Sequence, residues 1–210
     1  MLVSEIIERA QTQAEEVYDP TTWIQFINLA LDDLTPVIKM LTTKDGIAVA
    51  LTEGNGEIAI ASDADLAKAH EFLNVYFKPT GGSLEQLKGP LPLSNTYTKG
   101  WKQTAIQILF QNCGAVNGTA RVDYYKKLNH VTSIGDTPEL PDQYHNLLIL
   151  YACAKAQQKE EELNDKNDFY AEYLASKKNM AIDRIWMMEP QNRKFIRKAR
   201  IAALIGAQVQ

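Results

Sequence analysis

The residues that follow Pro141 carry the strongest secondary-structure signal in the chain. The stretch YHNLLILYACAKAQQKEEEL is rich in residues of high helix propensity. Pro141 suits the first turn of a helix, because its ring fixes φ and its missing amide hydrogen would have no partner there. Apolar residues form a stripe near the start, and the far half is polar. We therefore expect a long helical region over 141–188, either one helix or two broken near Asn164.

Two shorter amphipathic helices are expected before it. The first covers 2–17, where apolar residues recur at helical spacing. Asp19-Pro20 then signals a second helix, since an Asp can accept backbone N–H bonds as an N-cap and Pro fits the first position. Pro36 should kink or end this helix, which then resumes for a turn to residue 41. The short connection predicts an antiparallel helical hairpin, packed against the apolar stripe of the long helix.

Residues 46–128 differ in character and predict a small, mainly antiparallel β-sheet inserted between the helices. Asn55-Gly56 is a hairpin signal between the first two β-leaning runs. Residues 63–77 fit a short turn followed by a strand, and 78–100 form a loop rich in Gly and Pro. The β-leaning runs are 47–51, 57–61, 104–110 and 120–126. Helices on both sides of this segment predict a helix-dominated α+β fold.

The charge of the chain is unevenly distributed. The total is -4 with a pI of about 5.5, which argues against a dedicated duplex-DNA binder. Residues 190–210, however, hold five Lys or Arg and no Asp or Glu. We expect 1–189 to form a single domain, followed by a basic C-terminal arm.

The arm interleaves basic and apolar residues, as an amphipathic helix bound to a partner does. The alternative is a chain terminus with incidental charge. We favour partner binding because the apolar residues are too many for a solvated tail. The candidate partner-binding residues are Arg193, Lys194, Phe195, Ile196, Arg197, Lys198, Arg200 and Ile201.

No constellation in the sequence is suited to catalysis or to holding a metal or cofactor. His70, His130 and His145 lack metal-ligand spacing. A P-loop, a nucleophile elbow and a dinucleotide fingerprint are all missing from the sequence. We interpret the neighbouring carboxylates as solvated surface charge, namely Asp32-Asp33 and Glu160-Glu161-Glu162, and Asp63 and Asp65 as local caps.

The cysteines and the N-terminus predict a reducing compartment. Cys113 and Cys153 are too few for a disulfide framework and are interpreted as reduced thiols. The N-terminus has no basic n-region, and no run approaches the roughly 20 apolar residues that cross a bilayer. We expect the protein to be made in the cytoplasm, without a membrane partner.

One patch leaves a second function open. Tyr124-Tyr125-Lys126-Lys127 mixes aromatic and basic residues, as nucleic-acid binders do. On a strand, however, Tyr124 and Tyr125 face opposite sides, so one of them belongs to the core. The alternative function is a soluble nucleic-acid-binding or regulatory module that uses this patch and the basic tail.

Three segments, taken in order, carry a family resemblance. They are WIQFINLA from Trp23, RVDYYKKL from Arg121, and ELPDQYHNLL from Glu139 leading into Tyr151-Ala152. Together they resemble the head-to-tail adaptor (connector) proteins of tailed bacteriophages. In those proteins a "W…wlN.A" helix, a "YYK.L" strand and a "LP..yh.LL..YA" helix occur in the same order. The resemblance covers about residues 1–180.

The resemblance implies a structural virion protein without catalytic activity or cofactor. Such adaptors form a ring, commonly of twelve subunits, beneath the portal protein at one vertex of the capsid. The ring extends the channel through which genomic DNA passes without sequence-specific binding, and it presents a surface to the next tail or connector component. In related adaptors the C-terminal segment holds the portal, and the basic arm is in the matching place. Glu160, Glu161 and Glu162 on the polar half of the long helix are candidate subunit contacts.

Overall fold

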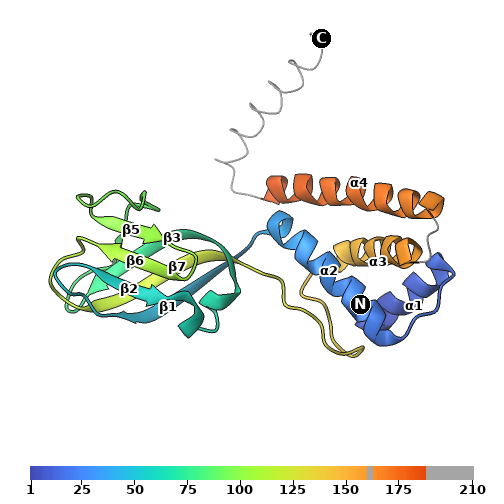
Figure 1. The fold of residues 1–210 in the computed structure, drawn as a ribbon, viewed down its shortest axis with the longest axis horizontal. Coiled ribbons are helices and arrows are strands. Elements are labelled where there is room, and N and C mark those ends of the chain that lie inside the picture. Colours follow the sequence, from blue (N-terminus) through green and yellow to red (C-terminus); the bar gives the residue numbers. More distant parts are fainter. Residues whose placement is uncertain (160–162, 188–210) are drawn as a thin grey trace, which may run out of the picture. The chain divides into compact units, whose positions relative to one another are not determined.

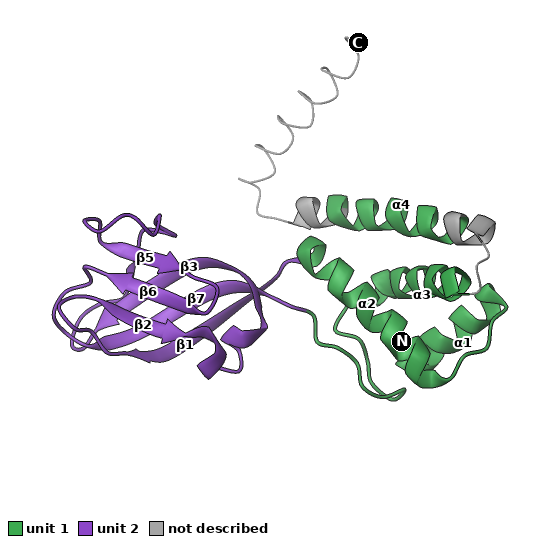
Figure 2. Ribbon diagram, viewed as in Figure 1, with its two compact units in different colours: residues 1–38, 128–210 green, residues 39–127 purple. Residues whose placement is uncertain are grey.

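The structure is a computed structural model that describes residues 1–159 and 163–187. The chain forms two compact units, each with its own apolar core (Figure 2). The helical unit consists of Met1–Ile38 and Leu128–Gln210, and the β unit, Lys39–Lys127, is inserted between these two segments. The α+β class is confirmed. The expectation that 1–189 acts as a single domain stays a prediction.

The helical unit contains all α-helices of the described residues (Figure 1). They are α1 (Val3–Ala14), α2 (Pro20–Ile38), α3 (His145–Lys159) and α4 (Leu163–Met187), with a 3-10 turn at Asp142–Tyr144 before α3. The predicted cap of α2 is confirmed, because Asp19 Oδ1 accepts the N–H of Thr22 at 3.1 Å. The helix continues through Pro36 to Ile38, where Lys39 has a φ of 46°. The extra turn to residue 41 is wrong, since a left-handed residue ends the helix and a strand follows.

The predicted long helical region is two helices, the second of the two arrangements considered. In Figure 1, α4 runs back alongside α3 in the opposite direction. Folding back buries Tyr173 and Met180, which a single straight helix would leave exposed. Helix α3 ends at Lys159 and α4 begins at Leu163, and α3 itself begins at His145 rather than directly after Pro141.

Helix α3 is the centre of the helical unit. Helices α1 and α2 both pack mainly on α3, and α4 covers another side of it. Cys153 faces α1, where its Sγ lies 3.5 Å from the carbonyl oxygen of Ala10. Tyr151 faces α4, where its ring lies 5.0 Å from the ring of Tyr173. Residues two apart on a helix point about 200° apart, so α1 and α4 lie on opposite sides of α3.

The β unit consists of two small antiparallel sheets that share one core. The four-stranded sheet has the order β1-β7-β3-β4, and the three-stranded sheet has the order β2-β6-β5. Their core includes Trp101, Val122 and the contact of Phe77 with Phe110, whose ring centroids are 5.9 Å apart. The strands are β1 (Met40–Val49), β2 (Gly56–Ala59), β3 (Ala69–Pro79), β4 (Glu85–Gln86), β5 (Gly100–Gln103), β6 (Gln107–Gln111) and β7 (Gly118–Lys126).

The predicted hairpin at Asn55-Gly56 is wrong. Strands β1 and β2 do not pair with each other, because β1 pairs with β7 and β2 with β6. The tight turn lies two residues earlier, at Glu53-Gly54, which both have positive φ. Gly56 is instead a residue of β2, where a Cβ atom would lie 2.5 Å from the carbonyl oxygen of Ala50. A close backbone approach, rather than a turn, explains this glycine.

The ambiguous segment before β3 is a short turn followed by a strand, as predicted. A 3-10 turn at Leu66–Lys68 leads directly into β3. Asp63 acts as the expected local cap, since its Oδ1 accepts the N–H groups of Asp65 at 2.9 Å and Leu66 at 3.2 Å.

Candidate interaction surfaces

The candidate functional features in the part of the chain that the structure describes are surfaces. Within it, no group of three or more His, Cys, Asp or Glu side chains is placed to hold a metal ion. His145 is buried and its Nε2 lies 2.7 Å from the carbonyl oxygen of Leu140, a structural role. Burial raises the pKa of Cys153 to about 12, so this thiol is unreactive near neutral pH. None of the described helices is both long and apolar enough to cross a membrane.

The residues predicted as partner contacts lie outside the described ranges. The subunit-contact residues Glu160, Glu161 and Glu162 fall between α3 and α4. The arm residues Arg193, Lys194, Phe195, Ile196, Arg197, Lys198, Arg200 and Ile201 follow α4. Both roles stay predictions.

The aromatic and basic patch on β7 is divided by the sheet. Tyr124 is only 2% exposed and packs against Phe72 in the core, as expected for one of the two tyrosines. Tyr125 lies at the surface of the sheet with the ammonium of Lys39 5.5 Å from its ring centroid. Tyr124 is therefore closed to base stacking, which weakens the nucleic-acid alternative.

The glycine- and proline-rich segment between β4 and β5 has a defined conformation. The N–H of Leu91 donates to the carbonyl oxygen of Trp101 at 2.8 Å, and the N–H of Trp101 donates to that of Lys88 at 3.0 Å. Lys102, which is almost fully buried, donates from Nζ to the carbonyl oxygen of Leu93 at 3.0 Å. At Gly100 a Cβ atom would lie 2.1 Å from the Lys88 oxygen, so this anchoring requires glycine.

The tip of this segment, residues 92–98, exposes two apolar side chains and is called the Tyr97 loop below. Asn95 Oδ1 accepts the N–H groups of Tyr97 at 3.1 Å and Thr98 at 3.0 Å, which closes the turn. Tyr97 is then 94% exposed and Leu93 61% exposed. A pinned loop that displays an aromatic side chain is suited to binding another protein, because little conformational entropy is lost on contact. The sequence signal was the pair of apolar residues within a loop of turn-forming residues.

A carboxylate clamp fixes α4 to α2. Asp33 Oδ2 accepts hydrogen bonds from the hydroxyl of Tyr173 and, at 2.6 Å, from Nζ of Lys177. Burial, and then the Asp33 carboxylate, raise the pKa of Tyr173, so its phenol stays a protonated donor. The prediction that Asp33 is only surface charge is therefore wrong, whereas its neighbour Asp32 does lie at the surface and pairs with His130. Sequence reasoning missed the clamp because its partners are 140 and 144 residues away.

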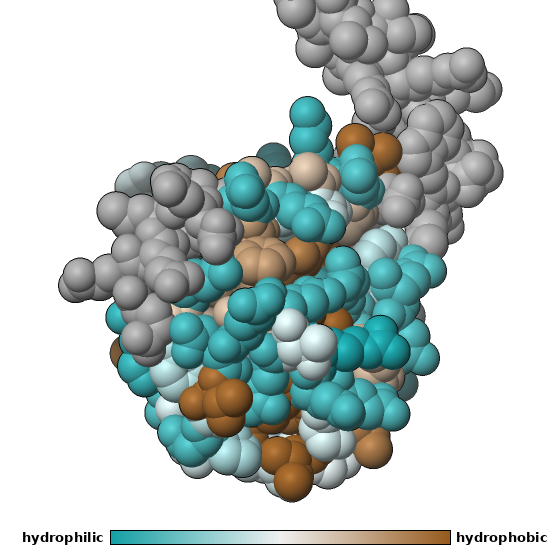
Figure 3. All heavy atoms as spheres, turned by 90° about the vertical axis from the view of Figure 1, so that its right-hand side faces the viewer, coloured by the Kyte–Doolittle hydropathy of each residue, from teal (hydrophilic) through white to brown (hydrophobic). Residues whose placement is uncertain are grey.

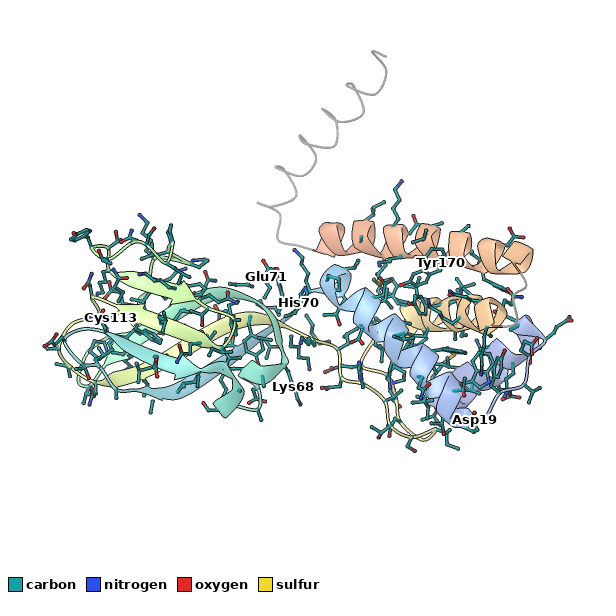
Figure 4. The ribbon with its side chains drawn as sticks, in the orientation of Figure 1. Asp19, Lys68, His70, Glu71, Cys113 and Tyr170 are labelled. Carbon is teal, nitrogen blue, oxygen red and sulfur yellow. The ribbon has the colours of Figure 1, made fainter. Side chains whose placement is uncertain are left out.

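The clamp sets which face of α4 is turned to solvent. Tyr173 packs between Tyr151 and Tyr170, with ring centroids 5.0 and 6.0 Å away. In Figure 4, Tyr170 is labelled on α4, Asp19 in the helical unit and Cys113 in the β unit. The hydroxyl of Tyr173 is thus held against α2 while its ring packs among the tyrosines of α3 and α4.

Comparison with known families identifies the chain. The sequence profile of the SU10 adaptor protein family matches residues 1–194. The chain belongs to the SU10 adaptor protein family. The match spans both units of this adaptor and reaches Arg193-Lys194 at the start of the basic arm. A comparison with curated proteins found no match.

Family membership confirms the resemblance to head-to-tail adaptors of tailed bacteriophages. This adaptor is accordingly a structural component of a phage virion. Its role is one of assembly with other phage components.

Proposed function

We propose that this adaptor assembles as a ring, with twelve subunits, that joins the capsid portal to the tail at the portal vertex. The ring extends the channel through which genomic DNA passes. The observation that carries the proposal is the family match over residues 1–194. The mildly acidic total charge supports it, because a wall that does not attract phosphate lets DNA slide.

Reconstitution with the cognate portal tests this function. The purified adaptor is mixed with portal rings and the complexes are imaged by electron microscopy. We expect added density of twelvefold symmetry on one end of the portal, with an open axial channel. Portals that stay bare at saturating adaptor concentration would contradict the function.

The basic arm, residues 190–210, is the portal hook in this proposal. Its mixture of five basic and several apolar residues fits an acidic, partly apolar surface on the portal. Truncation after Glu189 should abolish portal binding and leave the rest of the chain folded. The matched variant replaces the five basic residues by Gln and should lose the salt-sensitive part of the affinity. A truncated chain that assembles on portals like the full chain would refute the hook.

The Tyr97 loop is the contact with the next tail component in this proposal. Two exposed apolar side chains favour contact with a protein partner. A position that lines the DNA channel would instead favour polar side chains. Tyr97→Ser should weaken binding of the tail component to assembled rings, and Val116→Ser, at another exposed apolar residue of the β unit, should not. Equal binding by the two variants would exclude the loop.

A further inference from the structure

A hollow on the three-stranded sheet of the β unit holds a buried lysine that has no carboxylate partner in the described chain. Strand pairing sets Glu57 of β2, Leu109 of β6 and Lys102 of β5 in one row across the sheet (Figure 1). The neighbouring residues Phe110 and Trp101 are in the core, so this row lies on the opposite face of the sheet. The hollow that the row lines has a volume of about 560 Å³. We call it the Lys102 hollow.

Lys102 is the unusual residue of this hollow. It is only 8% exposed, yet no carboxylate of the described residues lies within ion-pair distance of its ammonium group. Its described hydrogen bond goes to the carbonyl oxygen of Leu93, 3.0 Å away. A lysine ammonium has three N–H donors, and buried lysines are almost always paired with a negative charge. The hollow therefore presents a cation that still needs an anion.

Gln111 adds a second donor to the same hollow. It is 7% exposed and follows Leu109 by two residues on β6, so its side chain lies on the same face of the sheet, diagonal to Lys102. Its buried Nε2 has no hydrogen-bond partner in the described chain. A buried N–H group without an acceptor costs free energy. Two neighbouring donors, one of them charged, match the two oxygens of a carboxylate.

The other end of the hollow is acidic and argues against nucleic acid as the occupant. Glu57 is exposed and lies two strand spacings from Lys102, about 10 Å, because Leu109 stands between them. Its Oε2 accepts a hydrogen bond from Nε2 of Gln107 at 2.9 Å. The row of phosphates on duplex DNA would be repelled by this carboxylate, whereas one acidic side chain can reach the ammonium group alone. The hollow thus favours a protein segment that carries an acidic residue.

The Lys102 hollow adjoins the Tyr97 loop. The bond from Lys102 Nζ to the Leu93 carbonyl oxygen joins the hollow to the loop directly. Asn112, the residue after Gln111, donates from Nδ2 to the carbonyl oxygen of Thr96 at 3.3 Å. A protein that contacts the Tyr97 loop is therefore close to the hollow.

The helical unit presents a less specific surface. Figure 3 shows apolar side chains scattered among hydrophilic ones on one of its faces. Single exposed apolar residues are normal on a protein surface. The Lys102 hollow is more informative, because its buried donors indicate the chemistry of the group that would fill it.

We propose that the Lys102 hollow binds an acidic side chain of the tail component that contacts the Tyr97 loop. The carboxylate accepts hydrogen bonds from Lys102 Nζ and Gln111 Nε2, and Leu109 contacts the aliphatic part of the same side chain. This contact rests on the proposed function and adds an ionic anchor to the apolar contact of Tyr97. It also gives a reason for a lysine, rather than an apolar residue, at a position that is nine-tenths buried.

The first experiment supplies the missing carboxylate from within the chain. Gln111→Glu places a carboxylate beside Lys102, so the two should form an internal ion pair that excludes the partner's side chain. We expect rings of this variant to bind the purified tail component about tenfold more weakly or worse. Gln103→Glu is the matched control and should bind like the wild type, because Gln103 is exposed on the strand of Lys102 and outside the lining of the hollow.

Circular dichroism of each free variant verifies the fold. Equal binding of the tail component by the two folded variants would overturn the proposal. A loss of duplex-DNA binding in Gln111→Glu, without a loss of tail binding, would overturn it as well and assign the hollow to nucleic acid.

The second experiment is carbodiimide crosslinking of the wild-type complex, which joins an amine to a carboxylate where the two are in contact. We expect mass spectrometry to detect an amide between Lys102 Nζ and an Asp or Glu of the tail component. The free chain should give no product at Lys102. A crosslink from Lys102 to another adaptor chain would overturn the proposal and assign the hollow to a second copy. An unmodified Lys102 in complexes that crosslink elsewhere would overturn it too.

The outcomes separate this anchor from the proposed function. Rings that form on portals and bind the tail component, but fail both tests, would refute the anchor while the proposed function stands. Failure of the wild type to form rings on portals would refute the proposed function. Crosslinking of the two purified proteins in solution would still test the anchor in that case.

Discussion

The Asp33 clamp leads to a prediction about stability, and the neighbouring residue Asp32 provides the control for it. In Asp33→Ala the buried hydroxyl of Tyr173 loses a charged acceptor, and Lys177 loses its ion pair. A hydrogen bond to a charged group contributes about 1.5–3 kcal/mol. The ion pair is partly exposed and adds at most about 1 kcal/mol. We expect Asp33→Ala to lower the free energy of unfolding of the helical unit by about 2–3 kcal/mol.

Asp32→Ala is the matched control. Asp32 is the adjacent carboxylate on α2, and its described partner is the half-exposed His130 at 2.9 Å. Its loss should cost less than about 1 kcal/mol, because exposed ion pairs are solvated in both states.

Urea unfolding followed by circular dichroism at 222 nm measures both variants, since the α-helices of the described chain all lie in the helical unit. Hydrogen exchange should show faster exchange in α4 for the Asp33 variant alone. A cycle with Tyr173→Phe isolates the coupling, which should exceed about 1 kcal/mol. Equal midpoints for the Asp33 and Asp32 variants, or additive losses in the cycle, would refute the clamp.

Three further outcomes follow from the geometry. Gly100→Ala should destabilise the β unit by about 1–3 kcal/mol in urea unfolding, because its Cβ would overlap the Lys88 carbonyl oxygen, whereas Gly135→Ala, with no atom closer than 3.7 Å, should be neutral. Cys153 should resist iodoacetamide at pH 8 until the chain unfolds, since its pKa of about 12 leaves almost no thiolate; rapid labelling of the native chain, read by mass spectrometry, would contradict its burial. Tyr97→Ala should leave the thermal midpoint unchanged within about 1 °C, because the side chain makes almost no contact, and a larger drop would mean that the loop depends on it.

The helical elements were predictable because their signals are local. The cap at Asp19 and the apolar spacing of α1 and α2 involve residues within a few positions of each other, and all appear in the structure. The family segments were equally readable, since they are short stretches in a fixed order. The period-2 rule for a strand predicted that one of Tyr124 and Tyr125 is buried, and in the structure it is Tyr124.

The pairing of the strands was not predictable from the same kind of signal. The turn residues Asn55-Gly56 indicated a hairpin between β1 and β2, but β1 pairs with β7 and β2 pairs with β6. A turn signal reports only the residues around it, and the choice between partner strands depends on which apolar faces meet in the core. The division into two sheets is therefore a property of the packed β unit.

What the sequence alone determined about this adaptor is its α+β class, its N-terminal helices, the glycine-rich loop and the family. Tertiary structure alone decided that the helical region after Pro141 folds back on itself at the end of α3. It also placed Asp33, which the sequence presents as a surface charge, in hydrogen bonds with Tyr173 and Lys177 of α4. Helix periodicity shows which residues share one face of a helix, whereas only contacts between residues far apart in sequence determine what that face touches.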